Sequence, residues 1–297
     1  MYEAIGHRRR GRGRDAVSCL VVRLAAVRLC TYLEATGPRP GVVDGERIVP
    51  LANASTGAIL GGEAIRVDEG AASILVVRAD LIQPHGPRTV LGIGLNYRAH
   101  AAETGREPPA EPMVFAKLSG AVAPPWGEIP RPAYTRELDY EGELAVVIGS
   151  ITRNVSAAVA TDHVFGYAVM NDVSARDRQR EEPRWIRAKG GDGFAPFGPW
   201  ITTTDEVPDP QQLGIRTWVN DELRQDGHTS DMVFSVADLV SWCSHQFTLH
   251  PGDVISTGTP AGVGAGFSPP RYLEPGDRVR VEIDGLGRLE HVVVEGL

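Results

Sequence analysis

The segment Thr135–Gly149, TRELDYEGELAVVIG, brings acidic side chains into an apolar strand. Its second half alternates and then becomes apolar, as a buried strand does. Residues two apart on a strand point to the same face, so Asp139, Glu141 and Glu143 would share one face. Carboxylates that enter an apolar sheet are costly unless a cation or a paired base lies beside them. The segment therefore predicts either a carboxylate site for a cation or an edge strand with a solvated acidic face.

A further acidic residue lies where another apolar strand ends. The run YAVMNDVSARDRQ passes from apolar residues into Asp172 and then into a segment with helical character. On a helix, Asp172, Arg176 and Gln179 would share one face, because residues three and four apart are neighbours. This set suits a metal with an anionic substrate, and a capping aspartate with an i,i+4 salt bridge is the alternative. Carboxylate oxygens are hard ligands, so the sequence indicates Mg²⁺ or Mn²⁺, with Ca²⁺ as a further candidate.

Other segments carry residues suited to proton transfer and anion binding. In NYRAHAAE, His100 and Glu103 are neighbours on a short helix, and such a pair can form a general base for water. Lys189 precedes two glycines, where a ligand can approach closely and the ammonium can neutralise a carboxylate or an enolate. A surface His–Glu pair and a surface lysine are the alternatives. The Gly-rich turn STGTPAGVGAG, which contains Thr259, offers backbone N–H groups to a carboxylate.

Charge and cysteine content narrow the class of protein. The chain of 297 residues has a formal net charge of −8, which argues against a general nucleic-acid binder. Cys19, Cys30 and Cys243 are widely spaced and odd in number, so we expect neither a disulfide framework nor a zinc site, and a cytoplasmic location. The basic run HRRRGRGRD precedes an apolar stretch that is too short to span a bilayer. We expect no membrane partner.

Strands joined by turns dominate the chain. Apolar runs such as TVLGI, MVFAKL, ELAVVIG and DVISTG are separated by turns and by short helices such as SVADLVSWCSHQ. This pattern favours a β-rich α+β fold over a doubly wound sheet. Short strands before the linker-like QPHGPR indicate a small N-terminal subdomain. We expect an extension over residues 1–26, a small subdomain over 27–85 and a catalytic domain over 86–297.

In this order, GLNYRAHAAE, ELDYEGELAVVIG, NDVSARDRQ, KGGDGFAPFGPW and TGTPAGVG resemble signature blocks of the fumarylacetoacetate hydrolase family. The resemblance covers roughly Arg88 to the C-terminus. It implies a mixed β-roll with a small N-terminal subdomain, in a protein that forms homodimers.

The same resemblance assigns roles to individual residues. It implies that the metal ligands are Glu141, Glu143 and Asp172. It implies that His100 and Glu103 activate water on a segment that closes over substrate as a lid. The residues that it places around the oxo-acid end of the substrate are Arg176, Gln179, Lys189 and Thr259.

The resemblance implies a metal-dependent enzyme of aromatic catabolism that acts on a small 2-oxo acid or 1,3-dicarbonyl compound. We predict hydrolysis of a C–C bond in an acylpyruvate-like or fumarylpyruvate-like acid, because the residues offer both an enolate sink and a water-activating pair. The enzymatic alternatives are a 2-hydroxyhepta-2,4-diene-1,7-dioate-type isomerase and an oxaloacetate-type decarboxylase. The non-enzymatic alternative is a catalytically silent relative that binds metal.

Overall fold

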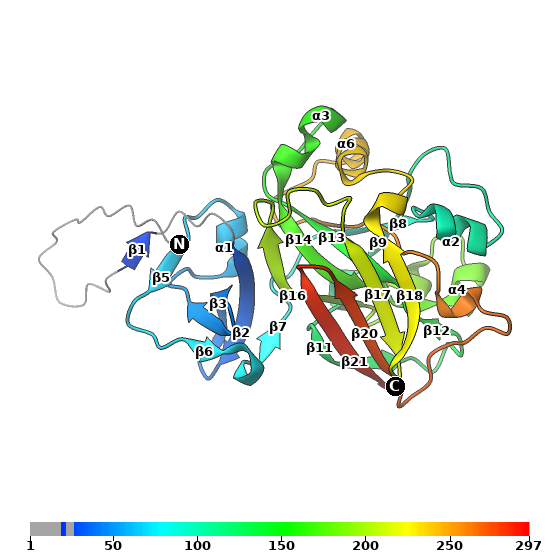
Figure 1. The fold of residues 1–297 in the computed structure, drawn as a ribbon, viewed down its shortest axis with the longest axis horizontal. Coiled ribbons are helices and arrows are strands. Elements are labelled where there is room, and N and C mark those ends of the chain that lie inside the picture. The colour runs from blue at the N-terminus through cyan, green and yellow to red at the C-terminus, as the bar shows by residue number, and fades with distance from the viewer. Residues whose placement is uncertain (1–18, 22–26, 297) are drawn as a thin grey trace, which may run out of the picture.

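The computed structural model describes residues 19–21 and 27–296, and Figure 1 shows their arrangement. Most of the expected extension over residues 1–26 lies outside the described residues. Its described part, β1 (Cys19–Val21), pairs antiparallel with β5 (Arg66–Asp68). Within the described part of the chain, α6 is the longest helix at 11 residues, and no helix has the length and hydropathy to cross a membrane.

A mixed sheet of twelve strands runs through the described residues. Its main path is β6-β4-β3-β2-β16-β14-β13-β19-β8-β9, with β7 beside β2 and β10 beside β16. The strands are β2 (Arg28–Glu34), β3 (Gly37–Asp44), β4 (Arg47–Pro50), β6 (Ile74–Leu75), β7 (Leu81–Ile82), β8 (Val90–Gly94), β9 (Met113–Lys117), β10 (Val122–Ala123), β13 (Gly142–Ile148), β14 (Val164–Asn171), β16 (Ala195–Thr203) and β19 (Val254–Ser256).

A second sheet of five strands packs against the centre of the first (Figure 1). Its order is β11 (Trp126–Arg131), β21 (Gly287–Glu295), β20 (Arg278–Ile283), β17 (Gly214–Val219) and β18 (Glu222–His228). The two sheets meet closely at Gly142, where a Cβ atom would lie 2.6 Å from Thr217 Oγ1 and 2.9 Å from Val281 Cγ1. Successive residues of a strand face opposite ways, so Glu143 points away from the second sheet.

Short helices and turns lie at the ends of the strands. The α-helices are α1 (Thr56–Leu60), α2 (Arg98–Glu103), α3 (Ala157–Ala160), α4 (Arg176–Glu181), α5 (Ile186–Lys189) and α6 (Val236–Gln246). The 3₁₀ turns are Val76–Arg78, Ser119–Ala121, Thr161–His163, Thr229–Asp231 and Gly264–Gly266. Two short strands, β12 (Leu138–Asp139) and β15 (Ser174–Ala175), pair with each other. In Figure 1, α2 and α4 lie at the end of the molecule remote from the N-terminal strands.

Strand β2 joins the N-terminal strands to the rest of the molecule. It pairs antiparallel with β16, with Leu29 opposite Ile201 and Arg28 opposite Thr202. Strands β2, β3, β4, β6 and β7 therefore extend the sheet that contains β13 and β14, whereas β5 pairs with β1 in a separate sheet. The long strands and the helix over SVADLVSWCSHQ appear where the sequence predicts them, which confirms a β-rich α+β fold.

Candidate metal centre

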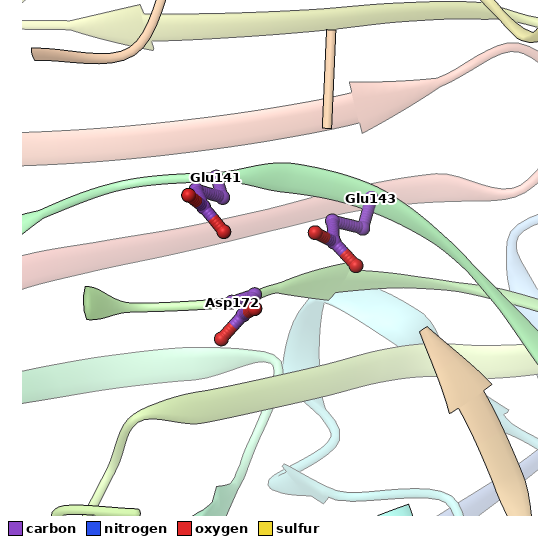
Figure 2. Close-up of side chains that lie close together, drawn as sticks. All are labelled: Glu141, Glu143 and Asp172. Carbon is purple, nitrogen blue, oxygen red and sulfur yellow. The ribbon is translucent and has the colours of Figure 1, made fainter. Parts of the chain in front are cut away.

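Two neighbouring strands bring three carboxylates together. Strands β13 and β14 are antiparallel, with Gly142 opposite Asn171. At the next residue pair, just beyond the ends of the two strands, the backbone N–H of Asp172 donates to the carbonyl of Glu141 at 2.8 Å. Ligand oxygens of Glu141, Glu143 and Asp172 all lie within 4.8 Å of one another, and all three residues are buried (Figure 2). Clustered carboxylate oxygens are the donor set that Mg²⁺ and Mn²⁺ prefer, so these residues fit a hard divalent cation.

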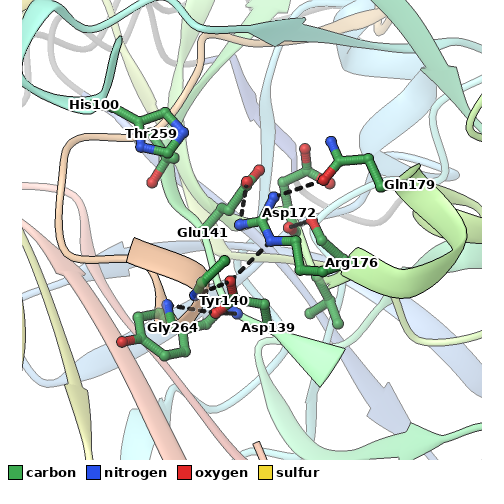
Figure 3. A network of polar contacts seen from close by, with 12 residues as sticks. His100, Asp139, Tyr140, Glu141, Asp172, Arg176, Gln179, Thr259 and Gly264 are labelled. Carbon is green, nitrogen blue, oxygen red and sulfur yellow. Dashed lines mark hydrogen bonds and ion pairs between the residues drawn. The ribbon is translucent and has the colours of Figure 1, made fainter. Parts of the chain in front are cut away.

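Asp139 does not share the face of these ligands, so the prediction of one continuous acidic strand face is wrong. The chain breaks between β12, where Asp139 lies, and β13. The Asp139 carboxylate accepts hydrogen bonds from the backbone N–H groups of Gly264 at 2.7 Å and Ala265 at 3.0 Å. It also pairs with Arg176 Nε at 2.8 Å (Figure 3). Its charge is satisfied by these donors.

Buried cations balance the carboxylate cluster. Lys189 Nζ lies 2.7 Å from Glu141 Oε2 and 2.8 Å from Asp172 Oδ2, so it bridges two acids that are opposite each other across the strands. Arg176 Nη2 lies 2.7 Å from Glu141 Oε1. Burial lowers the pKa of Lys189, but the charges of Asp172 and Glu141 outweigh it and raise that pKa. Lys189 is therefore a charged donor at the centre of the site.

The two glutamates of the triad have opposite electrostatic surroundings. Burial tends to raise the pKa of Glu141, but the charges of Arg176 and Lys189 hold it below its usual value. Burial and the charges of Asp172 and Glu141 raise the pKa of Glu143 well above its usual value. We attribute the difference to position, because Glu141 contacts both cations and Glu143 contacts neutral donors. A divalent cation would favour the ionised form of Glu143.

Lys117 belongs to the same cluster, although the sequence analysis did not identify it. It ends β9 with a fully buried side chain, and its Nζ contacts Asp172 Oδ1 and the carbonyl of Val173. Burial lowers the pKa of Lys117, against the opposing effect of Asp172. A lysine that closes the apolar run MVFAK is a signal that could have identified it, because a lone charge on a buried strand needs a partner.

The segment after Asp172 differs from the predicted helix face. Asp172 precedes α4, which begins at Arg176. Instead of an i,i+4 pair with Asp172, Arg176 forms ion pairs with Asp139 and Glu141. Its Nη1 donates to Gln179 Oε1 at 2.9 Å, which fixes the orientation of that amide (Figure 3). Arg176 and Gln179 are thus held together beside Glu141.

The Gly-rich turn after β19 binds carboxylates of the protein itself. Its backbone N–H groups donate to Glu143 from Gly258 at 3.0 Å and to Glu103 from Gly262 at 2.8 Å, in addition to the two that hold Asp139. Gly258 has a positive φ of 96°, and a Cβ atom there would lie 2.8 Å from Asn96 Cβ. The turn therefore positions one metal-ligand candidate and the partner of His100.

His100 and Glu103 form the predicted pair on α2. His100 Nδ1 lies 2.9 Å from Glu103 Oε2, while Glu103 Oε1 accepts the hydrogen bond from Gly262. Because Nδ1 faces a carboxylate, it carries the proton, and Nε2 is left as the acceptor. Asn96 precedes this helix but does not cap it, because its side-chain amide donates to the carbonyls of Phe234 and Thr257 and its Oδ1 accepts from the backbone N–H of Phe234.

Several of the residues described above line one cavity of about 500 Å³, and Asp172 and Glu103 are not among its lining residues. The Thr259 hydroxyl donates to the Gly142 carbonyl at 3.0 Å and accepts from Gln225 at 2.8 Å. Its proton is therefore already used in a hydrogen bond within the protein. The predicted residues that line the cavity are His100, Glu141, Glu143, Arg176, Gln179, Lys189 and Thr259. The cavity therefore combines a candidate cation site, anion-binding donors and a proton acceptor.

A buried carboxylate triad, together with a carboxylate-paired histidine that lines the same cavity as Glu141 and Glu143, gives this β-roll the features of an enzyme. Residues 89–294 match the family described as "Fumarylacetoacetate (FAA) hydrolase C-terminal". The chain belongs to the fumarylacetoacetate hydrolase family, as the sequence motifs predict.

Comparisons with individual proteins agree with this assignment. A protein of Burkholderia ambifaria, provisionally named a hydrolase, is 50% identical over 199 residues, which are 66% of this chain and 71% of that protein. The structure of a fumarylacetoacetate hydrolase from Exiguobacterium antarcticum is 36% identical, with a TM-score of 0.83 over 91% of this chain and 99% of that chain. A 2-hydroxyhepta-2,4-diene-1,7-dioate isomerase from Mycobacterium marinum is 36% identical, with a TM-score of 0.76 over 91% of this chain and 98% of that one.

Proposed function

We propose that this protein is a Mg²⁺- or Mn²⁺-dependent hydrolase that cleaves a C–C bond in an acylpyruvate-like or fumarylpyruvate-like 2-oxo acid. The observation that supports hydrolysis is that His100, oriented by Glu103, lines the same cavity as Glu141 and Glu143 of the carboxylate triad. A site that only held a cation would have no need of a histidine whose free nitrogen is kept as a proton acceptor.

The metal would be held by Glu141, Glu143 and Asp172, and when bound it would polarise the carboxylate and 2-oxo oxygens of the substrate. Lys189, already charged and central, would compensate the negative charge of a departing pyruvate enolate. Arg176 and Gln179 are hydrogen-bonded to each other, so their side chains are already held in place. They would therefore orient the oxo-acid end of the substrate without first having to change conformation.

Proton transfer would start at His100 Nε2. A water molecule would give its proton to this nitrogen, and the resulting hydroxide would attack the carbonyl remote from the 2-oxo acid. The C–C bond would then break, leaving one carboxylic acid and the enolate of pyruvate, which takes up a proton to become pyruvate. Glu103 would stabilise the imidazolium in between, since it remains hydrogen-bonded to Nδ1.

The direct test is cleavage of acetylpyruvate, followed by loss of the enol absorbance and by detection of pyruvate. We expect activity with Mg²⁺ or Mn²⁺ and its loss in EDTA, restored by added metal. If the protein decarboxylates oxaloacetate or isomerises a dienedioate but cleaves no acylpyruvate, hydrolysis is the wrong choice among the reactions. If it turns over none of these compounds, the catalytically silent relative is favoured.

The isomerase alternative is favoured by one comparison, because the Mycobacterium marinum neighbour carries that name. Isomerisation needs proton transfer without attack by water, and the same His100 could serve it. We further propose a homodimer in the cytoplasm with a role in aromatic catabolism. Light scattering coupled to size exclusion would test the dimer.

A further inference from the structure

Lys189, which lines the cavity, has one hydrogen-bond donor left for a ligand. An ammonium group carries three N–H donors. Glu141 Oε2 accepts one of them at 2.7 Å, and Asp172 Oδ2 accepts another at 2.8 Å. Among the residues that the structure describes, no acceptor receives the third N–H. The direction of this third donor depends on what else surrounds the ammonium.

The aromatic ring of Phe115 is the further neighbour of this ammonium. Lys189 Nζ lies 4.9 Å from the centroid of the ring, within the roughly 6 Å at which a ring face attracts a cation. Phe115 and Lys117 are two apart on β9, so they share one face of that strand, and Lys117 contacts Asp172. Strand β9 therefore supports both the ammonium of Lys189 and a carboxylate that it pairs with.

The Phe115 ring is itself held in place by two neighbours. It lies against Gly92, the residue opposite it on β8, where a Cβ atom would come within 2.2 Å of the Phe115 Cζ atom. It also meets the ring of Trp185 edge to face, with centroids 5.5 Å apart and an angle of 66° between the ring planes. A ring with both contacts has little freedom to turn, so its face stays beside the ammonium.

Trp185 connects the same ring to the backbone of α5. The backbone N–H of Lys189 donates to the carbonyl of Trp185 at 2.9 Å. Trp185 has a φ of 55°, in the left-handed region that a bulky residue rarely adopts, and such a conformation persists only where neighbouring contacts hold it. The contact with Phe115 is one of these. Both the backbone and the ammonium of Lys189 are therefore positioned relative to one phenylalanine ring.

We propose that Phe115 is a positioning residue, whose ring holds the Lys189 ammonium so that the third N–H is presented to an anionic ligand in the cavity. The ring attracts the cation through its negative face, so an aliphatic side chain of similar size cannot replace it. A phenyl ring has no proton to transfer, so Phe115 acts only through Lys189. This inference rests on the proposed function, because that function places Lys189 beside a departing enolate.

The test measures the binding of oxalate, an analogue of the pyruvate enolate that the enzyme does not cleave, by calorimetry in saturating Mg²⁺. Pentafluorophenylalanine in place of Phe115 nearly keeps the shape of the ring but removes its negative face. We expect oxalate to bind about twofold to thirtyfold more weakly to this variant, the range that cation–π attraction allows. Phe115→Leu, which removes the ring, should weaken oxalate binding at least as much.

The same fluorinated residue in place of Phe247 is the matched control, because Phe247 is 46% exposed and does not line the cavity. Oxalate affinity should not change there, and urea unfolding of each variant separates lost stability from lost positioning. If only Phe115→Leu weakens binding, the ring merely fills space and the proposal is overturned.

The other outcomes separate this inference from the proposed function. An unaltered protein that binds no oxalate would reject the proposed function and the inference with it. Equal oxalate binding by the unaltered protein and by both Phe115 variants would overturn the inference alone. The expected losses of affinity in a protein that cleaves no acylpyruvate would support the role of Phe115 while rejecting hydrolysis.

Discussion

At the scale of single residues, the carboxylate cluster and its buried cations form an almost balanced set of charges. Asp139, Glu141, Glu143 and Asp172 face Lys117, Arg176 and Lys189, so four negative and three positive charges leave a formal excess of one negative charge. Burial, followed by the charges of Asp172 and Glu141, raises the pKa of Glu143, and no cation contacts its carboxylate to offset these effects. A divalent cation would offset this excess negative charge beside Glu143, the carboxylate that has no cation in contact.

The substitution Glu143→Gln tests whether Glu143 is a ligand of a divalent cation. The amide oxygen can still accept from Gly258 and Ser256, so the fold should persist. Loss of one charged ligand should weaken Mg²⁺ binding by at least about 100-fold, which exceeds the usual effect of an outer-shell partner. Calorimetry would measure the affinity, with Glu128→Gln on an exposed position as the control. Mg²⁺ binding as tight as in the unaltered protein would remove Glu143 from the ligand set.

His100→Ala separates water activation from metal binding. Removing the general base should slow acylpyruvate hydrolysis by about 10²-fold or more, whereas oxaloacetate decarboxylation should suffer less because it needs no attack by water. Mg²⁺ affinity should stay the same, since His100 bonds to Glu103 and to none of the triad. Equal losses in both reactions would show that the residue does not act by activating water.

The identities of the candidate ligands could be predicted because their residue types and strand positions carry chemical meaning. The contacts of Lys117 could not, because Lys117 and Asp172 are 55 positions apart and meet only through the sheet. The sequence also did not indicate that Asp139 would pair with Arg176 instead of joining the triad. Whether a strand continues or breaks between positions 139 and 142 depends on pairing with β14 and β15, which the local alternation does not encode.

At the scale of elements, α2 carries His100 and Glu103, the residues that we propose for proton transfer near the triad. Followed by Gly105 and a Pro-rich loop, this short helix is held mainly by contacts with neighbouring loops. The backbone of Ala99 donates to Asp231, Arg98 donates to the carbonyl of Met232, and Glu103 accepts from Gly262. Gly266 leaves room for Glu103, since a Cβ atom there would lie 2.2 Å from its Oε1.

These ties join α2 to two loops, and none joins it to a strand of the large sheet. We therefore still predict that α2 becomes more ordered when ligand fills the cavity. Hydrogen exchange over residues 97–106 should slow when Mg²⁺ and oxalate are added together. Exchange in β13 should not change, because every residue of that strand is buried already. Exchange over 97–106 that is equally slow before and after addition would mean that α2 is not a lid.

At the scale of the whole molecule, two packed sheets and the shared pair of β2 and β16 hold the site. Most of the strands in these sheets could be predicted from the sequence, because long apolar strands are indicated by their length and by alternation of apolar and polar residues. Strands β11 and β18 were not predicted. Both lie in the second sheet, where much of β18 is exposed, and their sequences include Gly and charged residues that weaken the strand pattern.

His291 offers a test of global stability. It lies in β21, buried, with its Nε2 donating to the carbonyl of Pro124 at 2.9 Å, and burial lowers its pKa to about 4. Between that value and about 6.5, the unfolded chain binds a proton that the folded chain does not, so stability rises with pH across this window. The contribution is roughly 3 kcal/mol, lost as the pH falls toward 4.

Urea unfolding at pH 4.5 and 7.5 would measure this contribution. His291→Gln keeps a donor for Pro124 but cannot titrate, so its free energy of unfolding should change less between the two pH values. His245→Gln, at an exposed position, is the control. The same pH dependence in the His291 variant and the unaltered protein would show that acid destabilisation arises elsewhere.

The separation of the triad from the His100–Glu103 pair has a consequence for how such proteins diversify. The carboxylates lie on or directly beside the paired strands β13 and β14, where a substitution disturbs the packing of two sheets. The His100–Glu103 pair lies on α2, a short helix held by loops, where the backbone tolerates substitutions more easily than it does in the two sheets. Mutation can therefore alter the reaction and the preferred substrate in this segment while the cation site is inherited intact. That is one route by which relatives named as a hydrolase and as an isomerase could descend from a common ancestor.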